Sequence, residues 1–72
     1  MESIKKRYRI DRREIHFIKF ILEAYEGVAV LTTLDPKAGL IELMIAPGRE
    51  DEALDLIEDL GAQMRIERVE SN

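Results

Sequence analysis

Apolar and charged residues alternate at the start of the chain. Between Ile4 and Ile10, apolar residues occupy most of one side of a period-two pattern, while Lys5, Arg7 and Arg9 occupy the other side. A period of two is that of an extended strand, whose side chains point alternately to its two faces. The segment 4–10 is therefore predicted to be a strand with one mostly apolar side and one basic side.

A helix is predicted over residues 12–26. Asp11 is a preferred residue type at a helix N-cap, and Glu14, three positions later, completes a capping-box spacing. Apolar residues then recur three and four positions apart, which predicts a buried stripe of Ile15, Ile18, Leu22 and Tyr25, widened by Phe17, Ile21 and Ala24. The opposite face is polar and carries Arg12, His16, Lys19, Glu23 and Glu26. Gly27 then ends the helix, since glycine accepts the left-handed conformation common just after a helix.

Two strands, 28–34 and 40–46, are predicted to form a hairpin. Residues 35–39 have turn chemistry, because proline fixes φ and glycine permits a positive φ. With this five-residue loop Leu34 pairs with Leu40, and Leu31 faces Leu43 on the inner side of the sheet. A loop that differs by one residue would reverse the faces of the strand 28–34, so both registers stay open. The strand 40–46 is apolar on both sides in either register.

A second helix is predicted over 49–60, followed by a short closing strand over 64–69. The buried side of this helix is expected to consist of Ala53, Leu54, Ile57 and Leu60, with Leu56 flanking it. The resulting order β-α-β-β-α-β, within one domain over 1–72, is that of the ferredoxin-like sandwich. The fold class is therefore α+β: a four-stranded antiparallel sheet, strand order 4-1-3-2, with both helices on one face.

The face of the sheet away from the helices is predicted to be apolar over half its area. With the five-residue loop it receives Val28, Val30, Thr32, Leu34, Leu40 and Met44, and it also holds Glu42, which can pair with a basic residue of the strand 4–10. Exposed apolar patches mark interfaces, and the strand 28–34 is a sheet edge without charge, proline or glycine. These six residues are therefore the predicted interface of a homodimer; a protein partner, or a patch left partly in water, are the alternatives.

Composition narrows the function classes. The hydrophobic fraction of 46% argues against disorder, and the absence of cysteine excludes disulfides and thiolate chemistry. No apolar run is long enough to span a bilayer and no signal segment follows the start, so a cytoplasmic protein is expected. The net charge of −4 opposes nucleic-acid binding, although the first strand is basic.

Catalytic and metal-binding patterns are missing from the sequence. His16 is the single histidine, and no nucleophile has a neighbouring base, so neither an enzyme nor a metal or cofactor site is expected. The candidate ligand site is the corner formed by Asp11, Arg12 and Arg13, where two arginines lie beside the backbone amides at the start of a helix. The simpler interpretation of these arginines is that they are exposed to solvent.

Two resemblances add to this interpretation. The runs Tyr8–Ile15 (YRIDRREI) and Leu22–Gly27 (LEAYEG), with Ala46-Pro47-Gly48 after the hairpin, resemble a family of bacterial proteins of about this length and of unknown function. The chain also looks similar to ACT domains, small regulatory βαββαβ units that pair and bind amino acids between copies. Those domains have a glycine at the first strand-to-helix corner, where this chain has Asp11-Arg12-Arg13.

The expected function is that of a non-enzymatic, self-associating interaction or regulatory module. The resemblance to ACT domains implies an alternative, a small-ligand sensor of amino-acid type with a site between copies. An accessory subunit of an enzyme and an RNA-binding domain are further alternatives. No cofactor and no membrane partner is expected.

Overall fold

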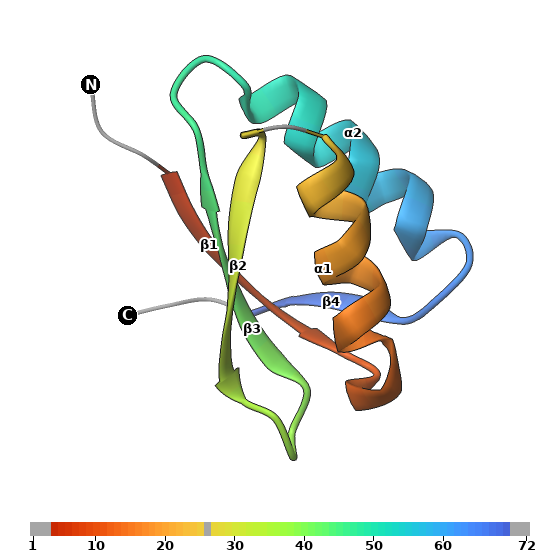
Figure 1. The fold of residues 1–72 in the computed structure, drawn as a ribbon. Helices are drawn as coiled ribbons and strands as arrows, with labels where there is room; N and C mark the ends of the chain where they lie inside the picture. Colours follow the sequence, from red (N-terminus) through yellow and green to blue (C-terminus); the bar gives the residue numbers. More distant parts are fainter. Residues whose placement is uncertain (1–3, 26, 70–72) are drawn as a thin grey trace.

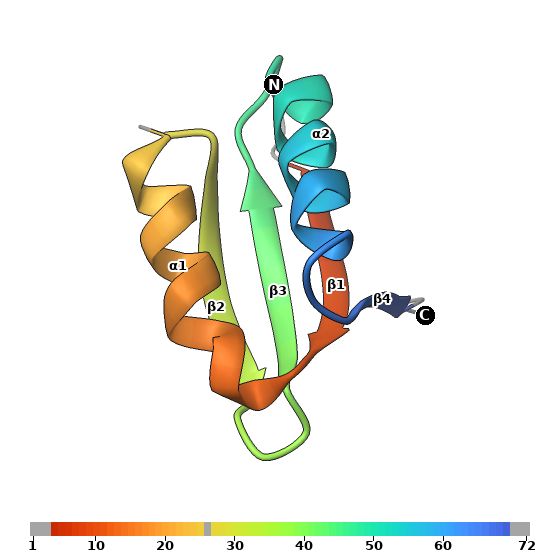
Figure 2. The same cartoon turned by 90° about the vertical axis from the view of Figure 1, so that its right-hand side faces the viewer.

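The computed structural model of the protein describes residues 4–25 and 27–69. Its elements follow the predicted order: β1 Ile4–Ile10, a 3-10 turn η1 Arg12–Glu14, α1 Ile15–Ala24, β2 Ala29–Asp35, β3 Leu40–Ile45, α2 Glu50–Gly61 and β4 Ile66–Val69. The strands form one antiparallel sheet in the order β2-β3-β1-β4. Both helices cover the same face of this sheet (Figures 1 and 2). The predicted α+β class and ferredoxin-like strand order are confirmed.

The corner between β1 and α1 begins with the predicted cap at Asp11. Its carboxylate accepts a hydrogen bond from the backbone N–H of Arg13 at 2.9 Å, and the N–H of Glu14 donates to the backbone carbonyl of Asp11 at 2.8 Å. This tight first turn is a 3-10 turn, and the α-helix proper begins only at Ile15. It ends at Ala24, while Glu26, the predicted last helical residue, lies outside the described residues.

The core lies between the inner face of the sheet and the two helices. From α1 it takes Ile15, Ile18 and Leu22, and from the sheet it takes Tyr8, Ile10, Ile41, Leu43 and Ile45, among others. The stripe on α1 is narrower than predicted, because Phe17, Ala24 and Tyr25 are exposed. At about 3.6 residues per turn, Phe17 and Ala24 fall on a flank of the helix, and Tyr25 follows its end. On α2, Leu56 is buried and Leu54 is exposed, the reverse of the prediction.

The hairpin has the predicted register over most of its length. Ala29 pairs with Ile45, Leu31 with Leu43 and Thr33 with Ile41. The predicted pair of Leu34 with Leu40 is wrong, because a β-bulge between Thr33 and Asp35 brings Asp35 opposite Leu40. The Asp35 carboxylate accepts hydrogen bonds from the N–H groups of Lys37 and Ala38, at 3.0 and 3.2 Å, and thereby tightens the turn.

The position of Val28 also differs from the prediction. The sequence pattern assigns Val28 to the face of the sheet away from the helices, but its side chain is fully buried in the core. The reason is that β2 begins at Ala29 and Val28 follows Gly27, whose φ is 74°. The strand alternation therefore does not extend back to Val28, and this residue drops out of the six predicted interface residues.

None of the described helices could span a membrane.

Candidate interaction surface

The sheet face away from the helices, called here the open face, is organised in rows of residues on neighbouring strands. One row joins Val30, Met44 and Lys5, and a second joins Thr32, Glu42 and Arg7. In the second row, Arg7 Nε and a carboxylate oxygen of Glu42 lie 3.2 Å apart, so the predicted pairing of Glu42 with a basic residue of the first strand is confirmed. A third row joins Leu40, Arg9 and Glu67.

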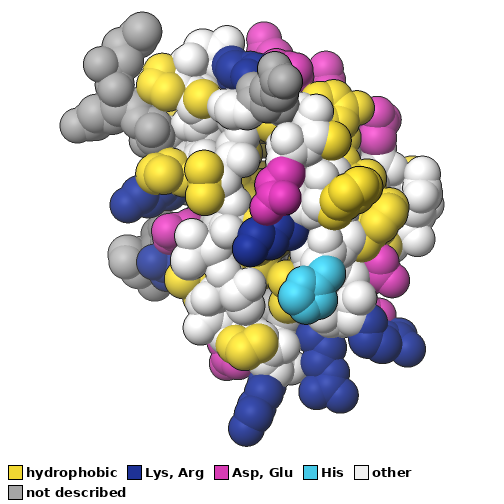
Figure 3. Space-filling view, in the orientation of Figure 1, with side chains coloured by type: hydrophobic (Ala, Val, Ile, Leu, Met, Phe, Trp, Pro, Cys, Tyr) yellow, Lys and Arg dark blue, Asp and Glu magenta, His cyan; other side chains and the backbone are white. Residues whose placement is uncertain are grey.

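Apolar side chains gather on the β2–β3 half of the open face. Val30 is 55% exposed and Met44 39%; Leu40 is half-buried, and Leu34, which is 40% exposed, lies in the bulge at the end of β2. We call these four residues the open-face patch. Hydrophobic side chains are visible on the sheet side of the molecule, next to basic ones, in Figure 3. Val30 and Met44 face each other across neighbouring strands, so this part of the patch runs from the sheet edge inward, and the row of Thr32 and Glu42 separates it from Leu40.

The outer edge of β2 has backbone groups that the sheet does not pair. The N–H of Ala46 donates to the carbonyl of Val28 at 3.0 Å, which fixes the phase of the β2–β3 ladder. Because bonded and non-bonded pairs alternate in an antiparallel ladder, Val30 and Thr32 bond to β3. The N–H and C=O groups of Leu31 and Thr33 therefore point outward, on the side where no strand of residues 4–25 and 27–69 neighbours β2.

The two edges of the sheet differ in charge and length. Over Ala29–Leu34, β2 is uncharged, and only its last residue, Asp35, carries a charge. The opposite edge strand, β4, has four residues, two of them Glu67 and Arg68. Short, charged edges resist pairing with another chain, whereas long uncharged ones favour it. Of the two edges, β2 is therefore the one suited to accept another strand.

The β1–α1 corner holds the three predicted ligand residues, and two of them, Asp11 and Arg13, bind each other. Asp11 is held by Arg13, whose Nη2 and Nε donate to its two carboxylate oxygens at 2.8 and 3.1 Å. These hydrogen bonds from Arg13 lower the pKa of the Asp11 carboxyl to about 2. Asp11 therefore positions Arg13 and is not free to hold a ligand by itself.

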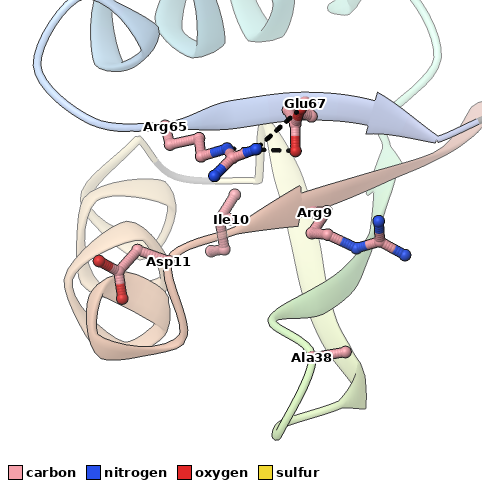
Figure 4. Close-up of a pocket in the computed structure, with 6 residues that line it drawn as sticks. All are labelled: Arg9, Ile10, Asp11, Ala38, Arg65 and Glu67. Carbon is pink, nitrogen blue, oxygen red and sulfur yellow. Dashed lines mark hydrogen bonds and ion pairs between the residues drawn. The ribbon is translucent and has the colours of Figure 1, made fainter.

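Two hollows lie on either side of this corner. The first has a volume of about 300 Å³ and is lined by Arg9, Ile10, Asp11, Ala38, Arg65 and Glu67 (Figure 4). In it Arg65 faces Glu67, with 3.3 Å between Arg65 Nε and a carboxylate oxygen, while Arg9 and Asp11 point in opposite directions. Because its charged groups are paired or diverge, this hollow does not gather charge on one point.

The second hollow is larger and more basic. It has a volume of about 550 Å³ and is lined by Arg12, Arg13, Ile15, His16, Thr33 and Pro36. The structure thus brings Arg12 and Arg13 together with His16, which the sequence pattern places on the solvated face of the helix. The sequence signal for His16 is its position one helical turn after Arg12, on the same side of the chain.

An exposed aromatic surface on α1 is a feature that the sequence pattern did not reveal. Phe20 is 70% exposed and Phe17 43%. They lie three residues apart, and so neighbour each other on the helix surface. Phe20 is outside the predicted apolar stripe, and nothing in the hydrophobic spacing distinguishes Phe17 from the core residues beside it.

Comparisons with known proteins give one result. Residues 8–64 match the model of a family described as a domain of unknown function, DUF4911. This segment runs from within β1 to the loop between α2 and β4. No significant match is found among curated proteins or solved structures. The predicted resemblance to a short uncharacterised family is confirmed: the chain belongs to the DUF4911 family.

Proposed function

We propose that the protein is a non-enzymatic interaction module that works as a homodimer, in which β2 of one copy pairs with β2 of the other. The observation that carries this proposal is the uncharged edge of β2, with outward-pointing backbone groups at Leu31 and Thr33, beside the open-face patch. Such an edge is a template for a further strand. A symmetric pairing of like edges closes after two copies and leaves no new edge.

Two contributions would stabilise a dimer formed through β2. Backbone N–H and C=O groups of Leu31 and Thr33 would exchange hydrogen bonds with those of the second copy, each contributing about 0.5–1.5 kcal/mol. Val30 would lie at the seam between the copies, where its exposed side chain would be partly covered. A domain of this size buries a modest share of its surface, so a second copy would add needed stability.

The oligomeric state tests this proposal directly. Light scattering behind size exclusion, over a dilution series, should give twice the chain mass of 8.3 kDa. Thr33→Pro should shift the protein toward monomer, because it removes an outward N–H and leaves the bonds to β3 intact. Thr33→Val is the matched control, since it keeps the N–H and should stay dimeric. A wild-type protein that is monomeric at every concentration would refute the proposal.

A second function is favoured by one specific observation, the hollow that Arg12, Arg13 and His16 line together. The charge of Arg12, beside Arg13 and the hydrogen-bonding ring of His16, suits a small carboxylate ligand such as an amino acid, which agrees with a sensor role. Thermal unfolding against a panel of amino acids would test it: a ligand should raise the unfolding temperature of the wild type, and less so that of Arg12→Gln. Lys5→Gln, which removes an exposed charge from the open face, is the control. No stabilisation by any panel member would contradict this second function.

A further inference from the structure

The flank of α1 next to the β2 edge carries two opposite charges. Lys19 and Glu23 are both exposed and lie four residues apart, so they neighbour each other on the helix surface. His16 lies on the same flank by helical phase, and it lines a hollow together with Thr33 of β2. This shared hollow shows that the flank faces the outer edge of the sheet. Figure 3 shows that edge, with the single histidine in cyan.

Lys19 and Glu23 do not form an ion pair with each other within the helix. Among the described residues, neither belongs to an ion pair or a side-chain hydrogen bond. Their order, lysine before glutamate, is also the less favourable one for a pair four residues apart. Both charges are therefore available to a group from outside the chain.

Pairing of two copies through β2 would bring their α1 helices together. Figure 2 shows that α1 lies in front of β2, the edge strand, and extends past it at the edge of the sheet, while α2 lies in front of β1. Paired strands lie about 4.8 Å apart, which is less than the roughly 8–10 Å between the axes of packed helices. Two α1 helices over the paired edge strands would therefore have no space between them, and they would have to shift outward to pack against each other. The symmetry of the pair makes these helices antiparallel.

Lys19 and Glu23 also lie at the right position along the edge strand for such a contact. One end of α1, at His16, lies beside Thr33, and its other end leads through Gly27 into Ala29. The middle of the helix is thus level with the middle of β2. A twofold axis near Leu31 and Thr32 therefore passes close to the midpoint between Lys19 and Glu23.

We propose that in the paired protein Lys19 of each α1 forms an ion pair with Glu23 of the partner subunit, giving two equivalent pairs across the twofold axis. This inference rests on the proposed pairing through β2. The Lys19–Glu23 pairs would be a second contact in the dimer, in addition to the pairing of the strands. Their role would be selectivity, because the charges favour antiparallel pairing with a second copy over pairing with the edge of an unrelated chain. Charge complementarity of this kind contributes to partner choice more than to affinity.

Charge reversal tests the inference, with the dimer dissociation constant measured by sedimentation equilibrium at low salt. Lys19→Glu and Glu23→Lys should each weaken the dimer roughly 3- to 30-fold, since each replaces two attractive pairs by two repulsive ones. The double variant should restore the wild-type constant. A mixture of the two single variants should form heterodimers in preference to either homodimer. Lys37→Glu in the hairpin turn is the matched control and should leave the constant unchanged.

The outcomes separate this inference from the proposed function. If the wild type is a dimer and the single variants dimerise as strongly as it does, the contact between Lys19 and Glu23 is refuted while pairing through β2 stands. A double variant as weak as the single ones would refute it too. A wild type that stays monomeric refutes the pairing itself. Far-ultraviolet circular dichroism of every variant verifies that the fold is kept.

Discussion

The backbone N–H of Ile10 donates a hydrogen bond of 2.9 Å to the carbonyl oxygen of Gly39, and this bond ties the tip of the β2–β3 hairpin to the end of β1. The two backbones are so close that a Cβ atom on Gly39 would overlap the carbonyl oxygen of Ile10. Gly39 also has a φ of 72°. The position of the hairpin tip beside the β1–α1 corner, and so the shape of both hollows, depends on this glycine.

Gly39→Ala is therefore expected to be the most destabilising of three glycine substitutions. It adds a steric overlap with backbone to the cost of about 1–2 kcal/mol for a left-handed conformation. Gly48 has a φ of 82° but open space around it, so Gly48→Ala should cost about 1–2 kcal/mol. Gly61→Ala, in the last turn of α2 with open space, should be neutral or stabilising by up to about 1 kcal/mol. Urea unfolding measures all three, and a stable Gly39→Ala would contradict the close approach.

The strand order and most of the pairing could be predicted because burial enforces alternation. Ile41, Leu43 and Ile45 are all buried on the inner face, and a slip by one residue would expose all three. The bulge at the end of β2 could not be predicted, because it depends on how the Asp35 carboxylate holds the turn. Val28 was misplaced for a similar reason, since the pattern does not show at which residue after Gly27 the strand begins.

The candidate surfaces divide in the same way. The uncharged edge follows from the sequence once the strand order is known. The grouping of Arg12, Arg13 and His16 around one hollow does not, because it depends on how α1 is seated above the end of β2. Helical spacing sets the angle between residues, and packing then decides which flank faces the edge of the sheet.

Tyr8 is expected to set part of the alkaline limit of stability. Burial raises the pKa of its phenol above the ordinary value of 10.0, against a smaller opposing effect of the Arg68 charge. Above about pH 10 the unfolded chain therefore loses this proton before the folded one, and the free energy of unfolding falls as the pH rises. Tyr8→Phe should show a shallower decline in urea unfolding between neutral and alkaline pH. Equal declines for the two proteins would contradict the buried position of the phenol.

Asp11 is expected to act at the opposite end of the pH range. Its pKa in the folded protein is about 2, below the ordinary value of 3.8, so its contribution to stability is full above that ordinary value and is lost as the pH falls toward 2. Asp11→Asn keeps an oxygen that can accept the Arg13 N–H but loses the charge. The variant should be less stable than the wild type at neutral pH, and the difference should shrink toward pH 2. Asp55→Asn, an exposed acid on α2, is the control. A difference that stays constant with pH would contradict the ion pair.

The geometry of self-association can be tested on the open face itself. Val30 lies on the edge strand, and Met44 lies directly opposite it on β3, one strand further from the edge. Val30→Lys would place like charges near the seam of an edge-paired dimer, and cross-strand contacts of this kind change the free energy by about 0.2–1 kcal/mol each. With two copies affected, the dissociation constant should rise by roughly 10-fold. Met44→Lys should change it by no more than about 2-fold, as expected for a surface substitution outside the interface.

Leu54→Lys provides the control for adding a lysine at an exposed apolar position. Leu54 is 39% exposed, as is Met44, but it lies on α2, on the other side of the sheet from the open face. Analytical ultracentrifugation of the three variants then distinguishes two ways of covering the open-face patch. A strong effect of Val30→Lys alone supports edge pairing, in which Met44 stays available to a further partner. If Met44→Lys weakens the dimer as much as Val30→Lys while Leu54→Lys does not, two copies pack face to face, and pairing through β2 is wrong.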